Sequence, residues 1–584
     1  MGEVHGHSPI CMDSNFKNDL FDLEVLNEDS GKYVIVKSTE EPEERATRRI
    51  KEVLLQGHPL VVAYSAGKDS STLVGITLTT ARDIIANGSM CPPIVIINSD
   101  TGVEQPEIVS LAKAEIKKML AFASIHEIPL EAKIGKPTIT ASFPVRVIGG
   151  RGLPSFPDSR SDCTTDWKIS VNQKSQKEVF AQLEGLAQWR RPVVMTGVRL
   201  DESIVRDQRI SKRGERAEGI WENDFGDLRL SPILDFSVDD VWQFIGLANA
   251  GVINTYSDFS ETMRIYRDAG GSSCVIVADM KGSSNSKPCG SRTGCWCCSR
   301  VSEDRSMEQM IESNPTRYGY LKPLAQLRNF ISRSQYDWTL RTFVGRTIDE
   351  AGYISIGADT YSPEMLQNLL RYTLSAQEQS GVPIISTRQL IAIDARWSQY
   401  ALCPPFTALR IYFEVMNGAI ELAPEIRRVH KTPVPKIGKI QVGHATFNAA
   451  MRGNVSGLRH VTMEMHHESC GFELKTLNDG SLVIDVEVDG DLTIDQEGAD
   501  DFLSFVAEEM IRDHCKVEST DWTFGYKCYL QYGTISISKG RSSQSHEILQ
   551  RSQWRQLNNL HGQQDRAELE SRCDVLFSAQ LELI

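Results

Sequence analysis

One stretch decides the fold of this 584-residue chain: Leu60-Val61-Val62-Ala63-Tyr64-Ser65-Ala66-Gly67-Lys68-Asp69-Ser70-Ser71. The five residues 60–64 predict a buried strand, the small residues after them a tight loop, and the following residues a helix. Small residues let backbone N–H groups approach an anion, and a helix N-terminus adds positive potential. The stretch therefore predicts a phosphate-binding site with serine hydroxyls as further donors and Lys68 as a mobile charge; the alternative is a plain serine-capped turn.

The spacing around Lys68 differs from that of the Walker A motif. Walker A places four residues between its first glycine and a Gly-Lys pair, followed by Ser or Thr, whereas Gly67-Lys68 is followed by Asp69. Further apolar runs at 94–98 and 192–196 alternate with helical segments. This alternation predicts an α/β fold, a parallel sheet with flanking helices.

Charged residues follow two other predicted strands. Asp100-Thr101-Gly102-Val103-Glu104 follows one strand, and Thr196-Gly197-Val198-Arg199-Leu200-Asp201-Glu202-Ser203 follows another, with Arg206 further on. The carboxyl ends of parallel strands meet at one edge of a sheet, so these groups are expected near the phosphate-binding loop. Arg199 and Arg206 are suited to stabilise negative charge on a nucleotide or second substrate. Taken alone, the second segment also fits a surface helix start with an ion pair.

Cysteines crowd one Gly- and Ser-rich loop, residues 269–300. Cys295 and Cys298 form a C-x-x-C pair, and Cys274 and Cys289 complete a set of four thiolates, with Cys297 left over. Glycine and serine cannot build an apolar core, so a metal site is favoured over buried structural thiols. Spacing alone leaves zinc and an iron–sulfur cluster both open.

The composition of the chain predicts the cellular location of the protein and limits the ligands that it is expected to bind. The chain has 13 cysteines, and neither a secretory signal pattern nor a long apolar run is found, which predicts reduced thiols, a cytoplasmic location and no membrane contact. The formal net charge is −14, which disfavours sequence-independent binding of nucleic acid over the whole surface.

The chain is expected to contain several parts. These are an N-terminal lead-in (1–45), the α/β domain with its cysteine loop (46–330), a helical segment (331–403) and a C-terminal α+β domain (404–584). A helical stretch is expected from Tyr320 to about Gln379. In the last part, Asn478-Asp479-Gly480 predicts a hairpin and 502–510 an amphipathic helix. The role of that part is open, with partner or nucleic-acid contact as a weak expectation.

Two of these motifs resemble known families. The loop S-x-G-K-D-S (65–70) resembles the PP-loop of ATP pyrophosphatases, and G-x-R-x-x-E-S (197–203) resembles an element of the phosphoadenosine phosphosulfate reductase family, although the E-C-G-x-H cysteine of true reductases is not found. The resemblance implies an adenine nucleotide alpha hydrolase-like fold, ATP and Mg²⁺. The implied nucleotide-binding residues are Ser65, Ala66, Gly67, Lys68, Asp69, Ser70, Ser71, Asp100, Gly197, Arg199 and Glu202.

A narrower resemblance covers about residues 50–379. The run C-G-S-R-T-G-C-W-C-C (289–298), together with Lys322-Pro323-Leu324, resembles the DNA phosphorothioation proteins, the C component of the Dnd system and the D component of the Ssp system. It departs from their pattern in the short interval between Cys289 and Cys295 and in the doubled Cys297-Cys298. This implies a 4Fe-4S cluster, ATP cleavage to AMP and pyrophosphate, a cysteine desulfurase as sulfur donor, other phosphorothioation subunits, and DNA reached through the complex.

The resemblance also assigns catalytic residues: Lys68, Asp69, Arg199 and Cys163. Cys163 lies in Arg160-Ser161-Asp162-Cys163-Thr164-Thr165-Asp166-Trp167-Lys168 and is either an acceptor of persulfide sulfur or a structural thiol. Alternative functions are tRNA thiolation, sulfonucleotide reduction, or a scaffold that binds nucleotide without turnover.

Overall fold

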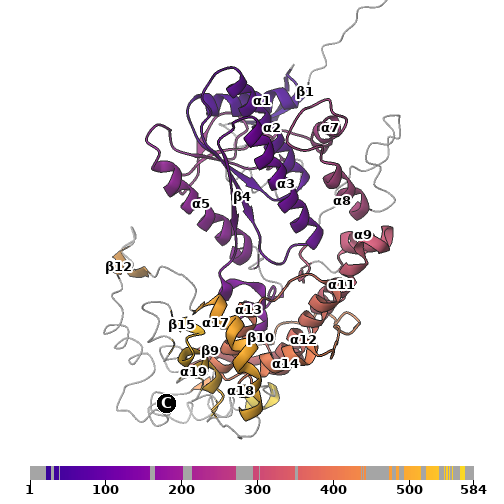
Figure 1. Ribbon diagram of the computed structural model, residues 1–584, viewed down its shortest axis with the longest axis vertical. Coiled ribbons are helices and arrows are strands. Elements are labelled where there is room, and N and C mark those ends of the chain that lie inside the picture. Colours follow the sequence, from indigo (N-terminus) through magenta and orange to yellow (C-terminus); the bar gives the residue numbers. More distant parts are fainter. Residues whose placement is uncertain are drawn as a thin grey trace, which may run out of the picture.

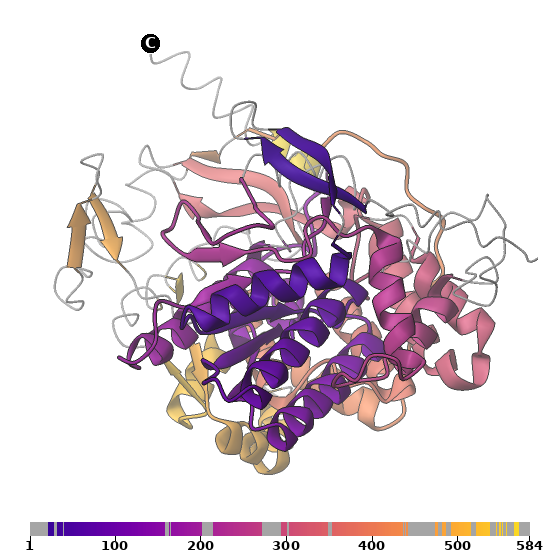
Figure 2. The ribbon, with the colours of Figure 1, turned by 90° about the horizontal axis from the view of Figure 1, so that it is seen from above.

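The computed structural model of the chain has an α/β part stacked on a mainly helical part (Figure 1). It describes residues 21–27, 32–38, 40–157, 163, 165–200, 214–270, 294–300, 303–348, 353–435, 437–438, 440–441, 473–476, 482–485, 492–514, 521–537, 545, 548–549, 552, 556 and 566–571. Seen along the long axis, the indigo-to-purple α/β part lies over the orange and yellow part (Figure 2). Among the described residues, no helix combines the length and apolar character that a membrane span requires.

A six-stranded sheet forms the centre of the α/β part. Its strand order is β5-β4-β3-β6-β8-β7, and every neighbouring pair is parallel except β7–β8. The strands are β3 (Leu60–Tyr64), β4 (Ile94–Ser99), β5 (Leu130–Gly135), β6 (Val193–Met195), β7 (Trp221–Glu222) and β8 (Leu228–Leu230). The order runs outward from β3 in both directions, so the topological switch point lies between β3 and β6. This confirms the predicted α/β class.

Helices cover both faces of this sheet. They are α1 (Pro42–Leu55), α2 (Lys68–Ala86), α3 (Pro106–Ile125), α5 (Ser170–Glu184), α7 (Val238–Asn249) and α8 (Ser260–Gly270). Val61 and Val95 pack with Val179 of α5, whereas Leu60 and Val62 belong to the core shared with α2 and α3. Alternate residues of one strand point to opposite faces, so each strand serves both layers. The short apolar runs were therefore correctly predicted as strands buried on both sides.

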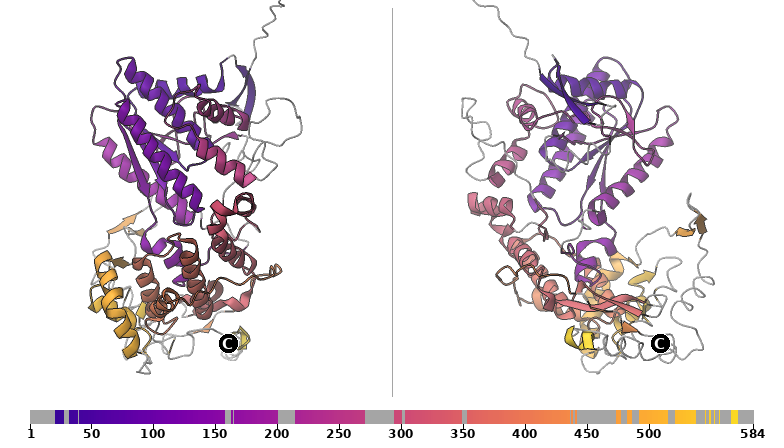
Figure 3. Two further views of the ribbon diagram at one scale, coloured as in Figure 1. Left: turned by 45° about the vertical axis from the view of Figure 1, so that its right-hand side comes forward. Right: turned by 180° about the vertical axis from the view of Figure 1, so that it is seen from behind.

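The second part of the molecule is mainly helical, and Figure 3 shows it beneath the α/β part in both views. Its helices are α9 (Arg305–Ser313), α10 (Pro315–Tyr318), α11 (Lys322–Arg333), α12 (Pro363–Ser380), α13 (Thr387–Gln399), α14 (Thr407–Met416), α17 (Gln496–Asp501), α18 (Ala507–His514) and α19 (Phe524–Gln531). One hydrophobic core runs from the sheet into these helices.

The predicted continuous helical stretch from Tyr320 to Gln379 is wrong in its middle. Strands β9 (Arg341–Ile348) and β10 (Tyr353–Tyr361) form an antiparallel pair between α11 and α12, and β10 also pairs with β11 (Ile440–Gln441). The sequence of 341–361 is rich in Thr, Val, Ile and Tyr, which favour strands. The helical pattern of the flanking segments masked this local preference.

Strands also appear at the two ends of the chain. The N-terminal lead-in contains an antiparallel pair, β1 (Phe21–Asn27) with β2 (Lys32–Ser38), and α1 begins at Pro42 inside the predicted lead-in. Near the other end, β12 (Glu473–Thr476) pairs antiparallel with β13 (Leu482–Asp485), and β14 (Leu492–Ile494) pairs with β15 (Ile535–Ile537). The predicted hairpin at 478–480 is thereby confirmed in its two strands. The predicted helix at 502–510 is also present, as a π-helical turn followed by α18.

A buried carboxylate, Asp394, connects three helices of this second part. Its Oδ1 accepts from the Ala408 backbone N–H at 2.8 Å, and its Oδ2 accepts from the Phe406 N–H at 3.1 Å and from the Tyr529 hydroxyl at 2.8 Å. Burial raises the pKa of Asp394 to about 6, against these hydrogen bonds, which favour the charged form. The carboxylate thus accepts hydrogen bonds from amides at the start of α14, but burial of its negative charge destabilises the folded state.

Asp394→Asn should change how stability depends on pH. A carboxyl whose pKa is raised in the folded state favours folding while it is protonated, and this contribution is lost as the pH rises from about 4 to about 6. Asparagine does not titrate, so the variant does not lose this contribution as the pH rises. Its stability relative to the wild type should therefore increase by about 2–3 kcal/mol between pH 4 and pH 7. Thermal unfolding of both proteins across this range measures the difference. Parallel profiles would show that the pKa of Asp394 is ordinary.

Candidate active site

The loop after β3 has the geometry of an anion site. Ala66 has φ of 57°, in the left-handed region that non-glycine residues seldom adopt, and Gly67 is the N-cap of α2. The unusual backbone turns the chain from strand to helix within three residues. It costs of order 1 kcal/mol, and such strain concentrates at functional sites. The amides at the start of α2 consequently lie at the carboxyl edge of β3, beside the switch point of the sheet.

Serine side chains fix the shape of this loop. The Ser65 and Ser70 hydroxyls lie 3.2 Å apart, and the Ser65 backbone N–H donates to Ser70 Oγ at 3.3 Å. The Ser70 hydroxyl in turn donates to the Gly67 carbonyl at 3.0 Å. Ser70 therefore closes the loop onto itself, as a residue in the first turn of a helix is placed to do.

Three charged side chains form a row at the loop. Asp69 Oδ2 lies 3.0 Å from Lys68 Nζ, and Asp69 Oδ1 accepts a hydrogen bond from Arg199 Nε. Arg199 is buried and also donates from Nη1 to the Phe236 carbonyl at 3.2 Å. The carboxylate thus holds two cations that come from opposite sides of the switch point. Asp69 and Arg199, which are 130 residues apart in the sequence, are thereby in direct contact.

Gly197 permits this contact between β3 and β6. A Cβ atom at Gly197 would lie 3.2 Å from the carbonyl carbon and oxygen of Asp69 and from the Ser70 nitrogen. These atoms are backbone and cannot move aside cheaply, so a side chain at this position would push α2 away. Gly197 therefore permits the close approach of two chain segments, and its role in nucleotide binding stays a prediction.

The segment after β4 lies next to the loop in the sheet. Asp100 Oδ1 accepts from the Gly102 N–H at 3.3 Å, and Asp100 Oδ2 lies 3.9 Å from Lys136 Nζ. Glu104 Oε2 accepts from the Thr101 N–H at 3.2 Å, and burial raises the pKa of Glu104. Lys136 directly follows β5, so Asp100 lies beside the segment after the neighbouring strand.

The C-x-x-C pair is attached to this second segment. Cys295 forms an antiparallel bridge with Glu104, and the Trp296 N–H donates to the Val103 carbonyl at 3.0 Å. The Cys298 N–H donates to the Cys295 carbonyl at 3.0 Å, so both thiols come from one tight turn. This is the arrangement that a C-x-x-C metal ligand pair requires.

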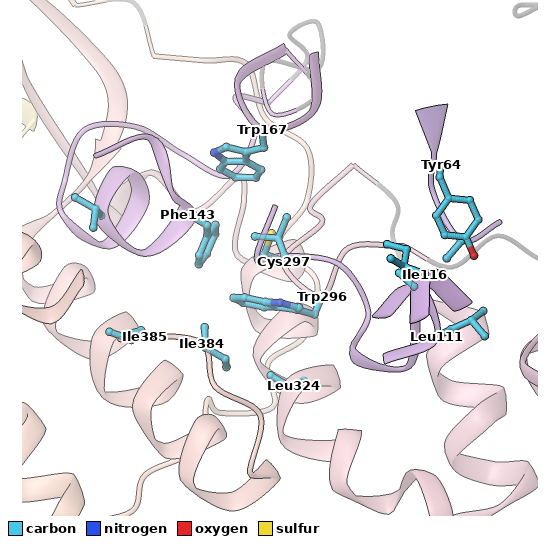
Figure 4. Close-up of a cluster of buried hydrophobic side chains, with 14 of the residues drawn as sticks. Tyr64, Leu111, Ile116, Phe143, Trp167, Trp296, Cys297, Leu324, Ile384 and Ile385 are labelled. Carbon is cyan, nitrogen blue, oxygen red and sulfur yellow. The ribbon is translucent and has the colours of Figure 1, made fainter. Parts of the chain in front are cut away.

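Trp296 anchors the turn in the core. Figure 4 shows Trp296 in the cluster of buried side chains with Phe143 and Trp167, and Cys297 beside them. The Phe143 ring centroid lies 5.1 Å from that of Trp296 and 5.8 Å from that of Trp167. The Cys297 side chain is buried, and burial raises the pKa of its thiol well above the ordinary value. Cys297, the thiol left over from the predicted four, therefore lies in the core.

Cys163 belongs to the same neighbourhood. The pKa of Cys295 is raised to about 11, mainly by burial; Lys168 opposes the rise, while the charges of Glu104, Cys298 and Cys163 add to it. Lys168 Nζ lies 3.8 Å from Glu104 Oε1. Cys163 is half-buried and packs against the core. The turn that holds Lys168 thus places Cys163 close to Cys295 and Cys298, which sequence spacing alone does not indicate.

Several predicted residues lie outside the described part of the chain: Arg160, Glu202, Arg206, Cys274 and Cys289. Within the described ranges, no three His, Cys, Asp or Glu side chains converge as a metal site. The described half of the proposed four-thiolate set, Cys295 with Cys298, nevertheless fits a metal or cluster by its turn geometry.

One residue at the loop was missed by sequence reasoning. Tyr266 of α8 accepts a hydrogen bond from the Lys68 backbone N–H at 3.2 Å, and its ring centroid lies 6.0 Å from Lys68 Nζ. Its ring packs edge-on against Trp242, with centroids 5.3 Å apart. No helix was predicted at 260–270, and the contact depends on how α8 packs against the start of α2.

Comparison with known proteins gives matches among solved structures. The sequence matches no protein-family model and no curated protein. FMN adenylyltransferase from Candida glabrata, bound to FAD and inorganic pyrophosphate, aligns at 14% identity over 35% of this chain with a TM-score of 0.21. The chain spans 58% of the length of that protein.

Two other structures align over larger shares of their own chains. The U34-tRNA thiolase NcsA from Methanococcus maripaludis, with its [4Fe-4S] cluster, aligns at 14% identity over 50% of this chain and 77% of NcsA, with a TM-score of 0.24. NAD+ synthetase from Burkholderia pseudomallei aligns at 15% identity over 38% of this chain and 84% of the synthetase, with a TM-score of 0.20. The assignment of the fold class rests on the strand order and connections of the sheet itself.

Proposed function

We propose that this chain is an ATP pyrophosphatase that cleaves ATP to AMP and pyrophosphate and adenylates a nucleic-acid backbone phosphate for replacement of oxygen by sulfur. The observation that carries the proposal is the row Lys68–Asp69–Arg199 at the strained loop that opens α2. This row lies at the switch point of a doubly wound sheet, where nucleotides bind in such folds. The loop lacks Walker A spacing, so transfer of the γ-phosphate is not the chemistry that its geometry favours.

The pyrophosphate leaving group is the natural occupant of the loop. The first amides of α2 and the Ser65 hydroxyl are donors at the anion position, and Lys68 Nζ neutralises charge that develops on the bridging oxygen. A non-bridging oxygen of the acceptor phosphate attacks the α-phosphorus of ATP. The bond from that phosphorus to the α–β bridging oxygen breaks, and pyrophosphate leaves. The buried Arg199 holds Asp69, so both carboxylate and lysine are oriented before substrate arrives.

Asp69 is also the carboxylate placed to receive Mg²⁺ bound to ATP. Mg²⁺ keeps most of its ligands as water and phosphate oxygens and takes one or two protein carboxylates. Each oxygen of Asp69 has one cationic partner in the described contacts, and a carboxylate oxygen accepts more than one interaction. The residues present therefore fit a substrate-borne magnesium ion.

We assign the second half of the reaction, the replacement of oxygen by sulfur, to the region around Cys163, Cys295 and Cys298. A cysteine desulfurase delivers persulfide sulfur, which a thiol reductant releases as hydrosulfide while the thiols form a disulfide. The hydrosulfide attacks the adenylated phosphorus, and the departing AMP carries the oxygen away. Cys163, Cys295 and Cys298 lie at the edge of β4, the strand next to β3, which favours sulfur chemistry beside the nucleotide. Cys295 and Cys298, with Cys274 and Cys289, would hold an iron–sulfur cluster or zinc, which when bound anchors this loop. DNA is the proposed acceptor, reached with partner subunits and a cysteine desulfurase.

Label-tracking of the products tests the proposal. Anaerobically purified protein is incubated with Mg²⁺ and either α-³²P- or γ-³²P-labelled ATP, with DNA, with RNA, with a sulfonucleotide, or alone, and in each case with and without the desulfurase. We expect the γ-label in pyrophosphate at a rate increased by DNA. The α-label should remain on the adenylated DNA without the desulfurase, and should appear in AMP when the desulfurase, cysteine and a thiol reductant are present. The γ-label in free phosphate and the α-label in ADP would refute the proposed class.

The same experiment distinguishes the rival functions. Stimulation by RNA instead of DNA would assign the chain to tRNA thiolation, and sulfite release from a sulfonucleotide would assign it to reduction. Bound but uncleaved ATP under every condition would favour a nucleotide-binding scaffold. Iron, acid-labile sulfide and zinc analysis of the same preparation decides between the two metal options.

A further inference from the structure

We infer that Tyr266 is a phosphate-binding residue, whose hydroxyl recognises the pyrophosphate part of the nucleotide. The inference rests on the proposed function and adds to it a residue from outside the sequence motifs. Tyr266 lies on α8, which follows the sheet strands in the chain (Figure 1), and its hydroxyl contacts the first residue of α2.

The Tyr266 oxygen occupies the position of an anion oxygen. It accepts a hydrogen bond from the Lys68 backbone N–H at 3.2 Å, and Lys68 is the first residue of α2. Amides in the first turn of a helix have no partner within the helix, and they are the groups that anions bind at helix N-termini. A Cβ atom at Gly67 would lie 3.5 Å from both the Tyr266 and the Ser65 hydroxyl oxygens. The two hydroxyls therefore flank the glycine from which the anion site begins.

Other contacts hold Tyr266 in place. Its ring packs edge-on against Trp242, which is buried on α7. Lys68 Nζ lies 6.0 Å from its ring centroid, which is within reach of a weak cation–π attraction. The phenol is thus positioned by the scaffold rather than by the loop, which is the condition for a binding residue that is ready before the ligand arrives.

The chemistry of the exchange favours a direct contact with phosphate. A phosphate oxygen is charged and is a stronger acceptor than a neutral hydroxyl, so it is expected to take over the Lys68 N–H when the nucleotide binds. A phenolic hydroxyl is a donor as well as an acceptor. The Tyr266 hydroxyl then moves off the amide by a small side-chain rotation while its ring stays against Trp242, and it donates to the same phosphate oxygen. AMP has no β- or γ-phosphate, so it does not gain this bond.

Tyr266→Phe tests the inference, because it removes the hydroxyl and keeps the ring. Isothermal titration measures the Kd of inorganic pyrophosphate, ATP and AMP, each with Mg²⁺. Loss of one charge-assisted hydrogen bond should weaken pyrophosphate and ATP binding roughly tenfold and leave AMP binding unchanged. The matched control is Tyr318→Phe, which removes a hydroxyl that donates to Asp268 of the same helix at 2.8 Å. This control should bind all three ligands like the wild type.

Each outcome decides between stated alternatives. Equal or tighter pyrophosphate binding by Tyr266→Phe would show that the hydroxyl only fills the empty loop, and would overturn the inference. Equal losses in Tyr266→Phe and Tyr318→Phe would assign the effect to the packing of α8 and would also overturn it. A wild-type protein that binds neither ATP nor pyrophosphate would refute the proposed function itself, whereas normal wild-type binding with no effect of Tyr266→Phe refutes this inference alone.

Discussion

Lys68→Ala lowers the rate of AMP and pyrophosphate formation by roughly 100- to 1,000-fold, the usual loss when one preorganised group that stabilises transition-state charge is removed. Lys68 Nζ is held 3.0 Å from Asp69 Oδ2, at the mouth of the loop that would carry the leaving pyrophosphate. Its charge matters most as the bond to the bridging oxygen breaks. The effect should therefore fall on kcat more than on KM.

Steady-state rates of AMP release under saturating Mg²⁺ and ATP measure this loss. The control is Lys51→Ala, which removes the same side chain from an exposed position on α1 and should leave the rate unchanged. Thermal unfolding of the Lys68 variant checks that the loop still folds. An unchanged kcat with a well-folded Lys68→Ala protein would show that the leaving group is not bound at this loop.

The sequence predicted the centre of the site because its signals are local. A strand of five residues, a loop of small residues and a helix start are contiguous in 60–71, and such local patterns predict a tight strand-to-helix turn. The parallel sheet followed from the alternation of apolar runs with helical segments. Rules of strand order then placed Arg199 near Asp69, because the ends of parallel strands share one edge.

Contacts between segments that are far apart in the sequence could not be predicted from such local patterns. Nothing in the sequence of 260–270 indicates that Tyr266 reaches Lys68, because that contact depends on how α8 packs against the start of α2. The meeting of Lys168 with Glu104, and of Glu104 with Cys295, depends equally on tertiary packing. The hairpin β9–β10 was missed for a different reason, because a strand preference of eight or nine residues was outweighed by long helical patterns on both sides.

Asp235→Ala should cost the α/β part about 3–5 kcal/mol of stability, the usual cost of removing one partner from a buried ion pair. The Asp235 side chain is fully buried, with Oδ2 at 3.1 Å from Arg45 Nε and Oδ1 at 2.7 Å from Arg49 Nη1. Both arginines are buried on α1. Arg49 keeps its ion pair with Glu218 at 2.7 Å in the variant, but Arg45 loses the carboxylate that compensates its charge. Thermal or urea unfolding measures the loss.

The control for this prediction is Glu52→Ala, which breaks the exposed pair with Arg48 at 3.5 Å and should change stability by less than about 1 kcal/mol. Equal stability of the Asp235 variant and the wild type would show that Arg45 and Arg49 find other partners. The site should also respond, because the residue after Asp235 is Phe236, whose carbonyl accepts from Arg199 at 3.2 Å. If the 235–236 segment is loosened, Arg199 loses its hydrogen bond to the Phe236 carbonyl and, among the described residues, keeps its contact with Asp69. Arg199 then orients the Asp69 carboxylate less firmly. If the proposed function holds, the Asp235 variant should lose AMP formation even at temperatures where it remains folded, because Asp235 precedes the residue whose carbonyl holds Arg199.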